Sequence, residues 1–181
     1  MATALVTRVA TGWLVMPRLE ARKRRILEAH QARDQFLAAM LRILSAGARL
    51  RNFAAPAADD GTWTPVMRKR VEAERARWVK QLDASTAWMV DNMETYTVSW
   101  PSDFLRGVVG TYVPYARAVV ISEREETRKA EPLEWLTTPV WEVFGSRGWQ
   151  RSPGRMRRAE RQLAERIQQI EAEVDRQNTP A

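Results

Sequence analysis

The only imidazole in this chain of 181 residues belongs to His30, which makes it the first side chain to consider for acid–base chemistry. Asp34 follows one helical turn later and Glu28 lies nearby, so a carboxylate could orient the ring as in a general-base pair. No serine or threonine nucleophile stands at a readable spacing from this pair. We therefore interpret His30 as a solvated or partner-facing side chain, with a pH-sensitive contact as its most plausible use.

Acidic residues gather in three small groups, none of which has the alternating ligand spacing of a calcium loop. A glycosidase would need two such carboxylates fixed across a cleft, and spacing along the chain does not indicate one. The groups are Asp59 with Asp60, Glu123 with Glu125 and Glu126, and Glu131 with Glu134.

The chain has no cysteine and only one histidine. Thiolate metal sites, cysteine nucleophiles, zinc sites and Ser-His-Asp triads all need more of these residues than the sequence offers. The sequence therefore predicts a protein that is not an enzyme and that holds neither a metal nor a cofactor.

The segment between Gly145 and Arg155 has the composition of an anion-binding turn. Exposed N–H groups at the start of the final helix, with arginines beside them, could hold a phosphate or sulfate. Neither of the glycine-rich phosphate-binding fingerprints is present. We favour the plainer interpretation, in which a helix C-cap is followed by an N-cap and the arginines are solvated. The residues of this candidate anion site are Ser146, Arg147, Arg151, Ser152 and Arg155.

Positive charge is concentrated in three stretches of the chain. Twenty-nine basic and 22 acidic groups give a net charge of +7, and 25 of the basic groups are arginine. Residues 18–25 carry +4, residues 68–80 carry +4 and residues 147–161 carry +5, so the rest of the chain is negative. The arginine excess has two interpretations, phosphate or carboxylate recognition and codon bias. The clustering predicts basic faces that meet an anionic partner.

The N-terminal segment combines an apolar stripe with a basic cluster. Residues 2–16 contain one charge, Arg8, and the run that follows is too short for the ~18 to 20 residues of a bilayer crossing. No signal-peptide cleavage site follows it. We expect an amphipathic surface helix, a helix docked on the core, or the end of a longer membrane span that leaves on the cytoplasmic side. The stripe is Leu5, Val9, Trp13 and Met16, and the cluster is Arg18, Arg22, Lys23, Arg24 and Arg25.

The pattern of apolar residues predicts an all-α protein, an antiparallel bundle of about four to five helices. We expect a long helix from Pro17 to about Arg51 whose charged first half projects or docks elsewhere, because only its second half is apolar over a wide arc. Residues 1–25 would form an arm and residues 26–181 a single domain. The other expected helices are 64–96, starting at the Thr64-Pro65 cap; 103–124; a short one from 132 to 145, interrupted near Pro139; and 153–177.

Three further patterns concern packing. Gly107 and Gly110 suggest a close approach of a neighbouring helix. The last helix carries a narrow heptad stripe, which predicts a two-helix seam either inside the bundle or with a second copy of the chain. That self-association seam is Met156, Leu163, Ile167, Ile170 and Val174. Of the eight tryptophans, four lie in apolar helical patterns and are expected in the core (Trp78, Trp88, Trp135, Trp141), and four lie in loops or ends (Trp13, Trp63, Trp100, Trp149).

These observations predict a non-enzymatic docking or scaffold protein. It would lie in the cytoplasm, either bound to the inner face of the cell membrane or as the cytosolic part of a membrane-tethered protein. The cations of residues 18–25 would bind the anionic membrane surface, and the N-terminal apolar stripe would insert into it. Two alternatives remain open. One is a nucleic-acid-binding protein that uses residues 18–25, 68–80 and 147–161. The other is an assembly protein that forms homo-oligomers.

Overall fold

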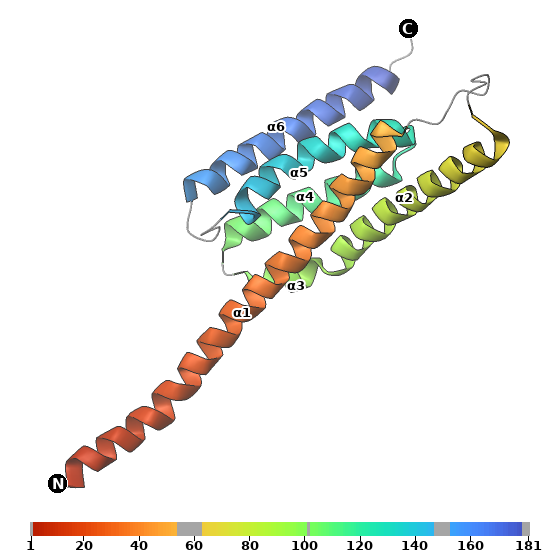
Figure 1. Ribbon diagram of the computed structural model, residues 1–181. Coiled ribbons are helices and arrows are strands. Elements are labelled where there is room, and N and C mark those ends of the chain that lie inside the picture. The colour runs from red at the N-terminus through yellow and green to blue at the C-terminus, as the bar shows by residue number, and fades with distance from the viewer. Residues whose placement is uncertain (1, 54–62, 101, 147–152, 179–181) are drawn as a thin grey trace.

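The computed structural model describes residues 2–53, 63–100, 102–146 and 153–178, with side chains described from residue 17 onward except at Asp175, Gln177 and Asn178. The described residues form six α-helices and one 3₁₀ turn, and they contain no strand, so the all-α prediction is confirmed (Figure 1). The elements are α1 (Ala2–Asn52), α2 (Pro65–Asp91), α3 (Met93–Ser99), α4 (Asp103–Ile121), η1 (Glu126–Lys129), α5 (Ala130–Phe144) and α6 (Pro153–Asn178).

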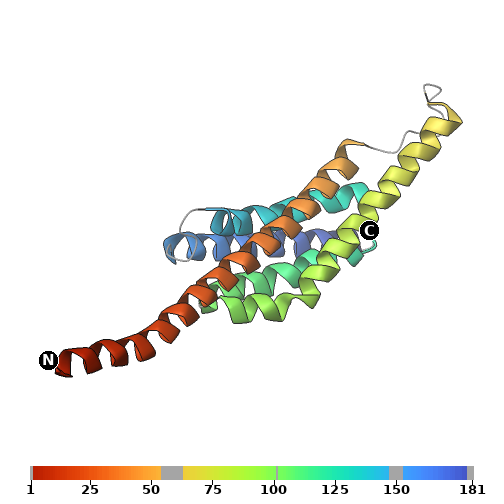
Figure 2. The same ribbon diagram turned by 60° about the horizontal axis from the view of Figure 1, so that its bottom comes forward.

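The helices pack as a bundle that α1 crosses at an angle. Helices α4, α5 and α6 contact one another, whereas α1 packs on α2 and α5, and α2 also packs on α4. The N-terminal part of α1 extends past one end of the bundle, as two views of the molecule show (Figures 1 and 2). The long helix is therefore shared between a packed half and a projecting half.

Burial along α1 begins abruptly. Residues 17–28 are all exposed, and Ala29 is the first buried residue among the described side chains of the helix. From there buried side chains recur every three or four residues, through Ala32 and Phe36 to Leu50. The expectation that the charged first half projects is met for residues 17–28. The helix was expected to start at Pro17, but this proline lies inside one continuous helix. An exposed segment tolerates it, because water can bind the carbonyl that proline leaves unpaired.

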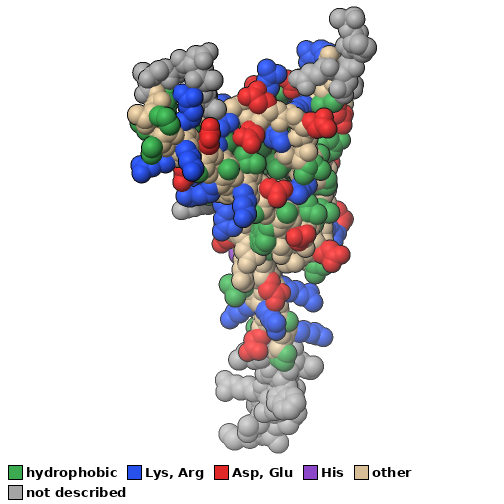
Figure 3. All heavy atoms as spheres, turned by 90° about the vertical axis from the view of Figure 1, so that its right-hand side faces the viewer, with side chains coloured by type: hydrophobic (Ala, Val, Ile, Leu, Met, Phe, Trp, Pro, Cys, Tyr) green, Lys and Arg blue, Asp and Glu red, His purple; other side chains and the backbone are tan. Residues whose placement is uncertain are grey.

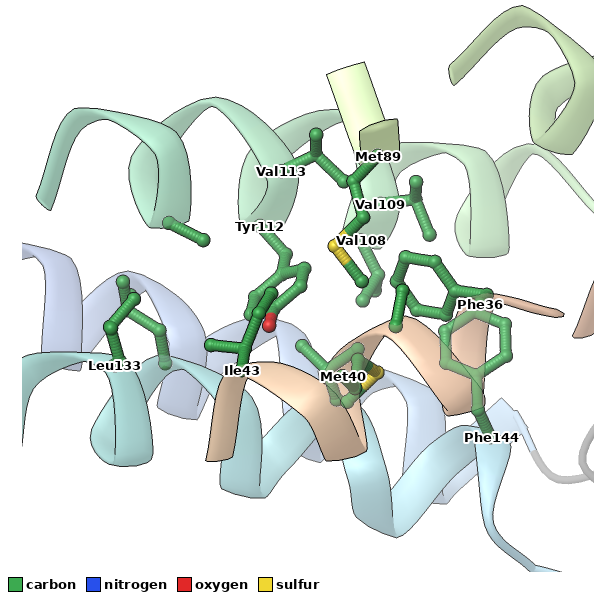
Figure 4. Close-up of a cluster of buried hydrophobic side chains, with 14 of the residues drawn as sticks. Phe36, Met40, Ile43, Met89, Val108, Val109, Tyr112, Val113, Leu133 and Phe144 are labelled. Carbon is green, nitrogen blue, oxygen red and sulfur yellow. The ribbon is translucent and has the colours of Figure 1, made fainter. Parts of the chain in front are cut away.

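Phe36 joins four helices through an aromatic cluster. Its ring lies 5.2 Å from that of Tyr96, 5.7 Å from Trp100, 6.0 Å from Tyr112 and 5.1 Å from Phe144, mostly in edge-to-face geometry. Figure 4 shows Phe36 beside Phe144 in the apolar interior. Aromatic pairs of this kind add about 0.5–1.5 kcal/mol each beyond the area they bury. The cluster fixes the point at which α1 enters the core.

The tryptophan prediction was partly wrong. Trp100, expected in a loop or end, does follow α3 but is fully buried, stacks on Tyr96 with centroids 5.4 Å apart, and donates its indole N–H to the Ala29 carbonyl at 3.3 Å. Trp78 is buried as expected, whereas Trp88, Trp135 and Trp141 are only partly buried. A residue at a chain turn becomes core here because the turn itself folds against α1.

Two helix boundaries differ from the sequence prediction. The helix expected to reach Tyr96 is divided at Asn92, whose backbone and side-chain N–H groups both donate to the Trp88 carbonyl. Side-chain capping of this kind ends a helix. In contrast, α5 continues through Pro139 without a break, and the Thr138 hydroxyl donates to the Glu134 carbonyl one turn earlier.

The glycine prediction was also wrong. A Cβ added at Gly107 or Gly110 would meet nothing within 4 Å, so no helix approaches closely there. Gly47, on the buried side of α1, lies against the start of α5 instead, and a Cβ added there would be in ordinary van der Waals contact with Ala130, 3.5 Å from its Cα.

The heptad stripe of α6 is used inside the chain. Met156, Leu163, Ile167 and Ile170 are buried in the core, where α6 packs on α5 and α4. Only Val174 is exposed, at 37%. The stripe therefore packs inside the bundle, which is one of the two alternatives expected for it, and self-association of the chain stays a prediction.

Arg75 ties α2 to the C-terminal end of α1. Its guanidinium is 9% exposed and donates to the carbonyls of Leu50, at 3.3 Å, and Phe53, and to the Glu126 carboxylate at 3.4 Å. The last carbonyls of a helix have no partner within the helix and carry partial negative charge. The buried guanidinium of Arg75 donates hydrogen bonds to carbonyls at this end of α1.

We predict that Arg75→Met lowers the free energy of unfolding by about 2–4 kcal/mol, because it leaves buried acceptors unpaired. Urea unfolding followed by tryptophan fluorescence measures the change. The matched control is Arg77→Met, which removes an exposed pair with Glu74 at 3.3 Å and should cost less than about 1 kcal/mol. Equal losses in the two variants would contradict the role of Arg75.

Tyr112 and Thr137 form a buried polar pair between α4 and α5. Their hydroxyl oxygens are 3.0 Å apart, and Thr137 donates its single hydroxyl proton to the Leu133 carbonyl at 2.5 Å. Tyr112 is therefore the donor to Thr137. Burial raises the pKa of Tyr112 to about 12.

This raised pKa predicts alkaline destabilisation. The neutral phenol is favoured in the folded state, so its stabilisation is complete below pH 10 and is lost as the pH rises towards 12. Tyr112→Phe should reduce the slope of the free energy of unfolding against pH in that window by up to about 1.4 kcal/mol per pH unit. Chemical unfolding at a series of pH values tests this, and an unchanged slope would refute it.

Candidate functional site

The basic cluster of residues 18–25 lies on the projecting part of α1. All five cations are exposed. From here on, the arm is the projecting segment of residues 17–28, and Figure 3 shows Lys and Arg side chains on both of its sides. Among the described side chains, Arg24 alone of the five forms an ion pair, with Glu28 at 2.9 Å. Exposed pairs of this kind contribute at most about 1 kcal/mol. The cluster therefore keeps an uncompensated positive field. Its members are Arg18, Arg22, Lys23, Arg24 and Arg25.

The arm also exposes large apolar side chains. Leu19 and Ile26 are half exposed, and Leu27 is 68% exposed. The residues predicted to insert into a membrane, Leu5, Val9, Trp13 and Met16, belong to α1, but their side chains lie outside the described part of the chain. In the described part, cations and apolar side chains thus share one free segment of helix.

The five cations of the arm do not share one face. Arg18, Arg22 and Arg25 follow one another at spacings of four and three, and the same alternation continues to the buried residues Ala29 and Ala32. At 3.6 residues per turn these three arginines extend the bundle-facing stripe of α1. The other two cations, Lys23 and Arg24, stand well away from that stripe, flanking the position of Leu27 on the opposite side of the helix. This division is not visible from charge counting alone.

The other two basic stretches are distributed differently. In residues 68–80, Arg75 is bound to the α1 terminus and Arg77 is paired with Glu74, while Lys69, Arg70 and Lys80 are exposed on α2. In residues 147–161, the described cations stand exposed at the start of α6, a different helix from the one that carries the arm. These are Arg155, Arg157, Arg158 and Arg161.

The candidate anion site is described only in part, since Arg147, Arg151 and Ser152 lie outside the described residues. The Ser146 hydroxyl donates to the Val143 carbonyl at 2.9 Å, and the Gly145 N–H donates to the Trp141 carbonyl at 2.8 Å. Both groups therefore serve the C-terminal cap of α5, in line with the plainer interpretation. Arg155 lies at the start of α6, where it lines a shallow hollow with Glu142 and Arg158.

His30 is exposed on α1, just inside the point at which the helix leaves the bundle. Its expected partner Asp34 accepts two hydrogen bonds from the Arg33 guanidinium, at 2.8 and 3.0 Å. That carboxylate is thus already engaged by a cation. Together with Leu27 the two residues border a shallow hollow along the helix surface.

Arginine side chains bind three of the five clustered carboxylates that the structure describes. Glu126 pairs with Arg75, Glu134 with Arg51 at 2.8 Å, and Glu125 lies 3.7 Å from Arg128. Asp59 and Asp60 lie outside the described residues. Within the described part, no group of three His, Cys, Asp or Glu residues could hold a metal ion.

Sequence reasoning missed an apolar groove between α1 and α5. The Arg51–Glu134 pair stands at its rim, and the groove encloses about 280 Å³. The available signal was the pair of small residues Gly47 and Ala48, both of which line the groove. The apolar lining is Ile43, Leu44, Ala48, Leu133 and Trp141.

None of the described helices has the length and apolar character that a bilayer crossing requires. The chain matches no known protein family, no curated protein and no solved structure.

Proposed function

We propose that this protein is a non-enzymatic docking protein that binds an anionic membrane surface through the projecting part of α1, while its helical bundle contacts protein partners. The observation that carries this proposal is the exposed cation cluster of residues 18–25, in which Arg24, paired with Glu28, is the only member that forms an ion pair among the described side chains. A scaffold that only needed solubility would not require its charges on a helix that leaves the bundle.

The energies are of the right size for reversible docking. Each basic residue close to an anionic bilayer contributes about 1 kcal/mol, so Lys23 and Arg24, which flank Leu27, supply about 2 kcal/mol where that side of the helix meets the membrane. The arginines on the opposite side lie about one helix diameter, 10–12 Å, from that surface. Because the screening length at physiological salt is about 8 Å, their attraction to the membrane is weaker but adds to the total. Apolar side chains such as Leu27 add to this when they enter the interface.

Docking also accounts for a helix that the bundle does not support. Residues 17–28 bury no side chain in the bundle. Isolated helical segments of this length are marginal in water, and most helical stability in proteins comes from packing. A membrane interface supplies the missing surface, so the arm gains helical order as it binds.

Nucleic-acid binding has weaker support. It was expected to use three basic stretches together, but Arg75 and Arg77 of the second stretch are engaged within the chain. The described cations of the third lie on α6, a different part of the molecule from the arm. We therefore place the membrane surface first.

Removal of residues 1–25 is expected to abolish vesicle binding without unfolding the protein. The shortened chain begins at Ile26 and retains every residue of α1 that the structure describes as buried. Its free energy of unfolding should stay within about 0.5 kcal/mol of the full chain, as for other exposed changes. Urea unfolding and co-sedimentation with phosphatidylglycerol-containing vesicles measure the two properties. Full binding by the shortened chain would eliminate the arm as the docking element.

A charge-matched pair of variants tests the electrostatic part. Replacement of Arg18, Arg22, Lys23, Arg24 and Arg25 by Gln should reduce the partition onto anionic vesicles at least tenfold, which corresponds to about 1.4 kcal/mol. The control loses the same five charges elsewhere, from exposed cations of the bundle, and should bind within about threefold of the wild type. The control positions are Arg42, Arg49, Lys69, Lys80 and Arg157.

Equal losses in the two variants would show that net charge, and not the arm, determines binding. Neutral phosphatidylcholine vesicles and high salt provide the baseline, because the attraction is screened as salt rises. Binding to neutral and anionic vesicles alike would also overturn the electrostatic proposal.

A further inference from the structure

The three arginines of the bundle-facing stripe occupy positions that would be core in a longer bundle. Arg18, Arg22 and Arg25 continue the spacing of Ala29 and Ala32, which are buried at 3% and 4% exposure. A helix stripe with this alternation of three and four residues normally packs against another helix. In this chain the stripe runs on past the end of the bundle, and its residues change from apolar to cationic.

The described part of the chain leaves this stripe uncovered. Arg18, Arg22 and Arg25 are exposed, and no ion pair is formed by them among the described side chains. The one carboxylate that binds an arm cation, Glu28, takes Arg24, which is not on the stripe. The three guanidinium groups therefore lie along one side of the helix, and the rise from Arg18 to Arg25 is about 10 Å at 1.5 Å per residue. Their N–H groups are available to a binding partner.

The shape of the molecule limits what can reach this row. From Ala29 onward the same side of α1 is covered by the bundle, so an extended flat surface laid on the stripe would collide with the bundle end. A flat membrane can instead meet the opposite side of the arm, where Leu27 is 68% exposed between Lys23 and Arg24. A rod as narrow as one helix fits beside the stripe without that collision.

We propose that Arg18, Arg22 and Arg25 form a docking stripe for an acidic helix of a partner protein, which packs on α1 in line with the core of the bundle. The partner presents carboxylates at spacings of three and four residues, because the arginines have that spacing. Arginine binds carboxylates through two parallel hydrogen bonds, which gives this contact a fixed register as well as charge attraction. The membrane contact on the other side of the arm is independent of it.

Two synthetic helical peptides of equal composition probe the stripe. The first carries glutamates on one face at alternating spacings of three and four, and the second distributes the same glutamates around the helix. Fluorescence anisotropy at low salt, with the full chain, is expected to show at least about tenfold tighter binding of the one-face peptide. Equal binding of the two peptides, or no binding of either, would overturn the proposal.

Two triple variants locate the contact. The first variant should bind the one-face peptide about tenfold more weakly or worse. It combines Arg18→Gln, Arg22→Gln and Arg25→Gln. The control, with Lys23, Arg24 and Arg42 each replaced by Gln, loses the same charge from other exposed sides of α1 and should stay within about threefold. Circular dichroism and urea unfolding confirm that both variants fold. Equal weakening would show a non-specific charge effect and contradict the stripe.

Competition experiments separate the partner classes. If anionic vesicles or a short RNA duplex displace the one-face peptide from the wild type, the stripe serves a lipid or a nucleic acid and the proposal fails. If vesicle-bound protein still binds the peptide, the two sides of the arm act independently, as proposed. A failure of vesicle binding alone would affect only the membrane proposal, because the peptide assay contains no lipid.

Discussion

The aromatic cluster around Phe36 is the interaction on which the rest of the structure depends. It joins α1 to α3, α4 and α5, and the Trp100 indole N–H adds a hydrogen bond to the carbonyl of Ala29, the first buried residue of α1. At the other end of the packed half, Arg75 binds the last carbonyls of the helix. The packed half of α1 is thus held at both ends, and what lies before Ala29 is free for other contacts.

The sequence was sufficient for the fold class and for most helices because their signals are local. Thr64 before Pro65 marks the start of α2, where its hydroxyl accepts the Met67 N–H at 3.3 Å. The heptad stripe of α6 likewise identified side chains that are buried. Apolar spacing and capping act over one or two turns, so a single sequence displays them.

The sequence predictions were wrong where contacts between helices, and not the local pattern, determine which residues are buried or in contact. Trp100 follows a helix end and is polar at its indole nitrogen, yet it is buried because α1 supplies both an aromatic surface and a carbonyl acceptor. Gly107 and Gly110 face open space, whereas Gly47 meets Ala130, and only the path of α5 distinguishes them. For the arm, charge clustering located the cations, but the division into two sides required knowing which face of α1 enters the core.

Continuity of α1 has a mechanical consequence. The segment that we propose to meet a surface and the segment that carries Phe36 are one helix, with Pro17 inside it and no connecting loop. A force applied to the outer end therefore acts on the bundle as on a lever whose pivot is near Ala29. The indole N–H of Trp100 is hydrogen-bonded to that pivot, so tilting of the lever would stretch this hydrogen bond and change the emission of Trp100.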